Sequence, residues 1–128
     1  MSQSSITECN AANDAANSLL DGGTIEIRTG SVPDIDLGPS GAVLETFTIP
    51  ATAFQASVSR VAVMNTIAPI STATSGSPPY HYEAFDSLGN LRRSGTVGVS
   101  NSDMIISKPV WVAGDTLQIT AWSTEQPK

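Results

Sequence analysis

Histidine and carboxylate side chains are the groups in this 128-residue chain that could carry out acid–base chemistry. His81 is the only histidine, and a Ser-His-Asp or Cys-His arrangement would need it as the base. It lies inside a predicted strand between two tyrosines, so we interpret it as an exposed or hydrogen-bonded strand histidine rather than a catalytic base. A single histidine also leaves a histidine-based metal site short of ligands.

Three glutamates, Glu26, Glu45 and Glu83, lie in three different predicted strands. Two carboxylates on neighbouring strands could form the acid and nucleophile pair of a glycosidase. Nothing in the spacing makes these strands neighbours, and strand alternation points Glu26 and Glu45 toward the polar face. The chain contains neither a GxGxxG motif nor a Walker-type loop. We therefore predict that the protein is not an enzyme, and a small polysaccharide-active enzyme is the weakest alternative.

Metal and redox chemistry have few candidate residues. Asp34 and Asp36 lie two apart in a long loop and could both offer oxygen to a hard cation, although we interpret the loop as a solvated acidic segment. The single cysteine, Cys9, excludes an internal disulfide and a cysteine-based metal site. Cys9 lies on the apolar side of a predicted helix, so we expect it to be buried. We predict no cofactor and no metal.

Charge and hydropathy narrow the choice of partner. The net charge is −6, charged residues make up 14% of the chain, and the six basic residues offer no continuous phosphate-binding surface. No apolar run is long enough to cross a bilayer, and the first residues lack the pattern of a signal peptide. We expect no direct nucleic acid, no membrane and no small-molecule substrate. Uncharged polar surfaces are inexpensive to desolvate, which favours assembly with another protein.

One short helix is predicted over residues 8–21, before the first strand. Its predicted apolar side contains five residues, Cys9, Ala12, Ala16, Leu19 and Leu20. Thr7 is the expected N-cap, and Gly22-Gly23 is expected to end the helix through a left-handed residue. A helix of this length is marginal alone, so we expect the apolar side, with Leu19 and Leu20 most deeply buried, to pack on a sheet.

The rest of the chain alternates between short β-like runs and turns. The first strand is predicted around Ile25 and Ile27, and further strands over 42–49, 58–64, 80–86, 91–97, 104–106, 110–112 and 116–122. In the last strand, Trp122 is placed on the face opposite Leu117 and Ile119. The pattern predicts a mainly β fold, an antiparallel jelly-roll-like β-sandwich of about seven or eight short strands with one N-terminal helix. We predict a single domain over 1–128, with a flexible arm (1–7), the helix (8–21), the sandwich (24–122) and a polar tail (123–128).

Three blocks of the chain resemble a family of small tailed-phage virion proteins. The first block, residues 15–33, contains the helix, a Gly-Gly stop, a strand and a Thr-Gly-x-x-Pro turn. The second block is the run Gly41-Ala-Val-Leu-Glu-Thr-Phe-Thr-Ile-Pro-Ala-Thr-Ala-Phe54. The third block extends from Tyr82 through Asp86-Ser-Leu-Gly-Asn90 and Gly95-Thr-Val-Gly98 to Ala113-Gly-Asp-Thr-Leu-Gln-Ile119. The better understood members are capsid cement, or decoration, proteins with a jelly-roll β-sandwich. The chain departs from the family pattern at two places. Arg28 stands where an aromatic residue is expected, and Pro78-Pro79-Tyr80 stands where the start of a tryptophan-bearing strand is expected.

The resemblance implies a structural role on a phage capsid. The chain would bind the outer surface of the capsid, contact the major capsid protein and stabilise its subunit contacts, as a homo-oligomer (dimer or trimer) on a symmetry axis. It would be made in the host bacterial cytoplasm and reside in the virion. The candidate interface residues are Ile6, Thr7, Val32, Pro33, Ile35, Pro78, Pro79, Tyr80 and Trp122. The alternative is a carbohydrate-binding or host-recognition module of a phage tail or fibre, with exposed aromatics such as Tyr80 and Trp122 stacking on sugar.

Overall fold

A computed structural model describes residues 5–29, 41, 43–59, 61–69, 81–107 and 116–125 of the chain. Within these residues, helix α1 (Ile6–Ser18) is followed by seven strands. These are β1 (Thr24–Arg28), β2 (Val43–Thr48), β3 (Val61–Val63), β4 (His81–Phe85), β5 (Leu91–Gly98), β6 (Met104–Ile106) and β7 (Ile119–Glu125). The prediction of a mainly β fold with one N-terminal helix is confirmed.

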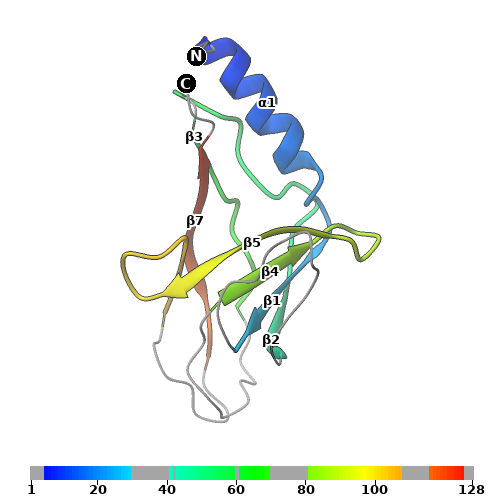
Figure 1. Ribbon diagram of the computed structural model, residues 1–128, viewed down its shortest axis with the longest axis vertical. Helices are drawn as coiled ribbons and strands as arrows, with labels where there is room; N and C mark the ends of the chain where they lie inside the picture. Colours follow the sequence, from blue (N-terminus) through cyan, green and yellow to red (C-terminus); the bar gives the residue numbers. More distant parts are fainter. Residues whose placement is uncertain are drawn as a thin grey trace.

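The strands form one seven-stranded sheet in the order β2-β1-β4-β5-β6-β7-β3. Figure 1 shows that the sheet curls, because β4 and β5 run obliquely to the long β7. Every pairing is antiparallel except that of β5 with β6, which is parallel. The prediction of a wholly antiparallel fold is therefore wrong at one pairing, and a jelly-roll sandwich is not confirmed.

The parallel pairing depends on the short loop between β5 and β6. The Asp103 carboxylate accepts hydrogen bonds from the Thr96 backbone N–H (3.0 Å) and hydroxyl (3.3 Å), which fasten the loop to β5. Gly98 leaves room for the loop, because a Cβ there would lie 2.6 Å from Ser102 Oγ. The loop thus returns the chain to the level of Val97. Strand β6 therefore starts beside Val97 and runs in the same direction as β5.

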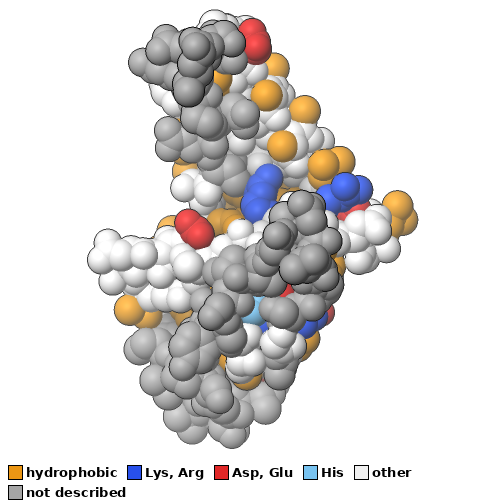
Figure 2. All heavy atoms as spheres, viewed as in Figure 1, with side chains coloured by type: hydrophobic (Ala, Val, Ile, Leu, Met, Phe, Trp, Pro, Cys, Tyr) orange, Lys and Arg blue, Asp and Glu red, His pale blue; other side chains and the backbone are white. Residues whose placement is uncertain are grey.

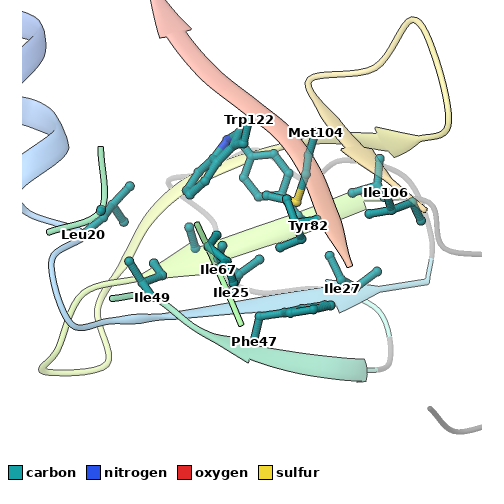
Figure 3. Packing of buried hydrophobic residues seen from close by; sticks show 14 of the residues in the cluster. Leu20, Ile25, Ile27, Phe47, Ile49, Ile67, Tyr82, Met104, Ile106 and Trp122 are labelled. Atoms are coloured by element: carbon teal, nitrogen blue, oxygen red, sulfur yellow. The ribbon is translucent and has the colours of Figure 1, made fainter. Parts of the chain in front are cut away.

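The core lies on the concave side of the curled sheet (Figure 3). Ile25 and Ile27 of β1 are completely buried, as their alternation with polar neighbours predicts. Apolar residues from most strands and from the connecting segments complete the cluster, among them Leu20, Phe47, Ile49, Ile67, Tyr82, Met104, Ile106, Ile119 and Trp122. Cys9 is buried outside this cluster, on the inner side of α1, and its predicted burial is confirmed.

Helix α1 begins and ends close to the predicted bounds but packs on a different side. Ser5, rather than Thr7, is the N-cap, and its hydroxyl accepts from the Glu8 N–H at 3.1 Å. The inward residues of the helix are Cys9, Asn13 and Asn17, whereas Ala12, Ala16 and Leu19 are exposed. The predicted apolar face is therefore wrong at three positions, because polar residues of α1 find hydrogen-bond partners in the segment that follows β2 and in β5.

The end of the helix matches the sequence prediction. Gly22 adopts a φ of +70°, the left-handed conformation expected after a helix. Gly23 packs directly on β4, where a Cβ would lie 1.9 Å from the Phe85 carbonyl oxygen. The two glycines together turn the chain from α1 into β1, and Leu20 beside them is completely buried.

Strand β7 departs from simple alternation. Ile105 pairs with Ala121 and Ile106 with Ile119, so Thr120 is an extra residue in the ladder. This irregularity shifts the phase of the strand and turns Trp122 to the same side as Ile119. The prediction that Trp122 lies opposite Ile119 is wrong for this reason.

Strand bounds differ from prediction at two other places. The predicted strand 58–64 is reduced to β3, with Val58 and Met64 in isolated bridges. Strand β7 extends to Glu125, so residues 123–125 of the predicted polar tail belong to the sheet. The predicted strand 110–112 lies outside the described residues.

Candidate functional site

The convex face of the sheet carries a cluster of ionisable side chains on β1 and β4. Glu26 pairs with Glu83 and Arg28 with His81 in the antiparallel register of these strands. Strand alternation points these four side chains away from the face that holds Ile25, Ile27, Tyr82 and Ala84. We call these four residues the ionic cluster.

Arg28 joins the two glutamates of the ionic cluster. Its Nε donates to Glu26 Oε1 at 3.0 Å and lies 3.6 Å from Glu83 Oε1. A terminal guanidinium nitrogen of Arg28 also pairs with Glu26 Oε1. On the other side of Glu83, Oε2 lies 2.8 Å from His81 Nε2. Glu83 therefore sits between an arginine and a histidine.

Burial distinguishes the members of the ionic cluster. The side chains of His81 and Glu83 are 0% exposed, whereas Arg28 and Glu26 retain 13% and 23% exposure. A histidine hydrogen-bonded to a carboxylate is a common acid–base pair, but a base must reach the proton that it removes. With His81 and Glu83 inaccessible to solvent, the geometry supports a role in holding β1 and β4 together.

Three of these residues, Glu26, His81 and Glu83, are candidates for acid–base chemistry in the sequence, and the fold brings them together. The interpretation of His81 as a hydrogen-bonded strand residue agrees with its contact to Glu83. Of the three glutamates considered as a catalytic set, Glu26 and Glu83 face each other across neighbouring strands. Glu45, on β2, pairs with Ile27 rather than with either of them. Arg28 is the fourth member of the cluster, and no local signal in the sequence indicates that it bridges two strands.

Trp122, which the sequence suggests with Tyr80 as a sugar-stacking residue, is buried beside Tyr82. Trp122 is 2% exposed and Tyr82 3%, and the two rings pack edge to face with centroids 5.4 Å apart (Figure 3). Trp122 Nε1 donates to the Tyr82 hydroxyl at 3.1 Å, and burial raises the pKa of that phenol. Trp122 is thus a core residue, which corrects its place in the candidate interface. Tyr80 and Trp111 lie outside the described residues.

The other candidate interface residues fall into two groups. Ile6 and Thr7 form the exposed first turn of α1, with Ile6 48% exposed, and belong to the helix rather than to the predicted arm. Six lie outside the described residues: Val32, Pro33, Ile35, Pro78, Pro79 and Tyr80.

Metal ligands are also limited in the described part of the chain. No three His, Cys, Asp or Glu side chains gather there in a way that could hold an ion. Asp34 and Asp36, the two aspartates that could offer oxygen to a hard cation, lie outside the described residues.

The surface of the described residues is hollowed at two places that adjoin α1 and the strand pair β3–β7. One, of about 200 Å³, lies between the second half of α1 and residues 52–56. The other, of about 400 Å³, follows β3 and β7 and is lined by uncharged residues, among them Val63, Met64, Ala121 and Trp122.

The chain was compared with protein-family models, curated proteins and solved structures. No family model, curated protein or solved structure matches it. In the described residues, α1 is too short and too polar to span a membrane.

Proposed function

We propose that this chain is a structural virion protein, a capsid cement or decoration protein that binds the outer surface of a tailed-phage capsid and stabilises contacts between subunits of the major capsid protein. The three sequence blocks that resemble that family support the proposal. The proposal includes a structural relationship of this fold to the jelly-roll β-sandwich of that family. The proposed state is a homo-oligomer, dimer or trimer, in the virion, made in the host bacterial cytoplasm.

Exposed apolar side chains on projecting elements are the observation that carries this proposal. Leu88, at the tip of the β4–β5 hairpin, is 86% exposed, and Val58 is 72% exposed. Figure 2 shows further hydrophobic side chains spaced along α1, where Ile6 and Leu19 are about half exposed. Covering such side chains with another protein removes apolar surface from water, which is favourable.

The state of the ionisable groups supports a non-enzymatic role. His81 and Glu83, which have the chemistry of an acid–base pair, contact each other inside the protein. A cement protein needs a rigid scaffold and a complementary surface, and many weakly bound copies share the load through multivalent attachment. A buried ionic cluster that fixes two central strands serves such a scaffold.

The carbohydrate-binding alternative gains no support from the described aromatics. A stacking platform requires an exposed ring, and Trp122 and Tyr82 are both in the core. We therefore propose the cement role alone.

Capsids stripped of this protein provide the test. We expect the purified chain to co-sediment with them and to raise the temperature at which they rupture. Leu88→Asp places a charge at the hairpin tip and should reduce co-sedimentation, whereas Asn101→Asp places the same charge on the exposed β5–β6 loop and serves as the matched control. Absence of co-sedimentation together with an unchanged rupture temperature would show that the proposal is wrong.

A further inference from the structure

The turn between β4 and β5 presents one exposed apolar side chain on a tightly hydrogen-bonded backbone. Its tip consists of residues 87–90 and projects from the side of the molecule in Figure 1. The side chain is that of Leu88, which is 86% exposed. We propose that Leu88 inserts into a closed apolar pocket, one leucine wide, on a subunit of the major capsid protein. This inference rests on the proposed function and deepens it, because it names the kind of surface that receives the chain.

Three consecutive backbone N–H groups of the tip all donate to one residue, Asp86. Those of Leu88 and Asn90 donate to Asp86 Oδ1, each at 2.9 Å, and that of Gly89 donates to the Asp86 carbonyl oxygen at 3.1 Å. A backbone N–H that enters an apolar environment without an acceptor costs about as much as a lost hydrogen bond. Because residues 88–90 already have their acceptors, the tip can leave water without exposing an unpaired backbone donor there to an apolar wall.

The hairpin also neutralises the charge at its own base. Asp86 Oδ2 accepts from Arg92 Nε at 2.9 Å and from the Asn90 side-chain amide at 3.2 Å. Residues 87–90 contain no ionisable side chain. An unpaired charge at the tip would oppose transfer into an apolar site. The tip is therefore suited to an uncharged pocket rather than to an acidic or a basic patch.

The narrow apolar surface of the tip favours a pocket over a flat face. All four tip residues are exposed, and Leu88 lies between the polar Ser87 and the Gly89-Asn90 pair. A broad apolar face would also cover Ser87 and Asn90, whereas a pocket takes up Leu88 and leaves these polar residues at its rim. The hydrogen bonds to Asp86 hold the turn in one conformation, so insertion loses little conformational entropy.

Co-sedimentation of Leu88 variants with capsids stripped of this protein tests the pocket. Leu88→Ala removes the inserted side chain and should weaken binding about tenfold, whereas the unbranched apolar side chain of Leu88→Met should keep it within about threefold of the wild type. Leu88→Trp offers more apolar surface but exceeds a leucine-sized pocket, so it should also weaken binding at least about tenfold. Val99→Ala is the matched control, because Val99 is 47% exposed on the loop between β5 and β6.

The outcomes separate the pocket from the cement role. If the wild-type chain co-sediments but Leu88→Ala binds equally well, or Leu88→Trp binds more tightly, the pocket is overturned and the cement role stands. Equal weakening by Val99→Ala and Leu88→Ala would likewise overturn the pocket, because exposed apolar surface in general would then account for binding. Failure of the wild-type chain to co-sediment would overturn both proposals.

Discussion

Glu26 and Glu83 face each other across β1 and β4, and the Arg28 guanidinium lies within reach of both carboxylates. Two carboxylates opposite each other on neighbouring strands repel, and Arg28 offsets that repulsion. Glu83 needs this partner more, because its side chain is 0% exposed while that of Glu26 keeps 23% exposure. The stability of the sheet should therefore depend unequally on the two glutamates.

Glu83→Gln is expected to lower the free energy of unfolding by about 3–5 kcal/mol, because it leaves the buried His81 without its carboxylate and removes one of the two carboxylates beside Arg28. Glu26→Gln removes a partly exposed charge next to the same arginine and should cost under about 1 kcal/mol. Urea unfolding followed by tryptophan fluorescence measures both values. Equal losses for the two variants would mean that burial of Glu83 does not determine its contribution.

The contact between Tyr82 and Trp122 gives a second prediction. Tyr82→Phe removes the acceptor of the Trp122 N–H in the core and should cost about 1–3 kcal/mol. In a Trp122→Phe background the same change should cost much less, because no buried donor is then left without a partner. A double-mutant cycle on thermal unfolding measures this difference. An identical cost in both backgrounds would show that the hydrogen bond does not stabilise the fold.

Local patterns were enough to predict much of the fold. Alternation placed Ile25 and Ile27 in the core, and the Gly22-Gly23 pair ended the helix with a left-handed residue. These features depend on neighbours within a few positions in the chain, where period and turn chemistry are informative.

Features set by distant contacts were not predictable from the sequence. Asn13 and Asn17 are buried because Ser57 and Arg93, 44 and 76 residues away, provide hydrogen-bond partners. The extra residue at Thr120 reverses the facing of Trp122, and it is visible only in the pairing with β6. The ionic cluster likewise depends on the register between β1 and β4, which no local pattern specifies.

Adjacent leucines at the end of α1 provide a direct test of how the helix packs. Leu20 is 0% exposed and belongs to the core, whereas Leu19 is 49% exposed. Leu20→Ala should cost about 2–5 kcal/mol, and Leu19→Ala should stay within the range of a surface substitution, under about 1 kcal/mol. Chemical denaturation of the two variants measures the contrast. A loss for Leu19→Ala as large as that for Leu20→Ala would mean that both leucines pack in the core, as the sequence predicts.

Asp86 gives the β4–β5 hairpin a dependence on pH. Its Oδ1 accepts from the backbone N–H groups of Leu88 and Asn90, each at 2.9 Å, and its Oδ2 accepts from Arg92 Nε at 2.9 Å. The backbone N–H of Asn90, helped by the Asn90 and Arg92 side chains, lowers the pKa of Asp86 from 3.8 to about 2. Because the folded state binds the proton more weakly than the unfolded state, the carboxylate stabilises the fold above pH 3.8 and loses that effect as the pH falls toward 2.

Asp86→Asn should therefore lower the melting temperature at neutral pH, and the gap between wild type and variant should narrow as the pH falls from about 4 to about 2. Calorimetric melting at a series of pH values measures the gap, with Glu8→Gln as a control for removing one exposed carboxylate. Leu88, at the tip of this hairpin, is the residue that we propose contacts the capsid, so loosening the turn should also weaken co-sedimentation at neutral pH. A gap that stays constant down to pH 2 would mean that the Asp86 hydrogen bonds do not favour its ionised form.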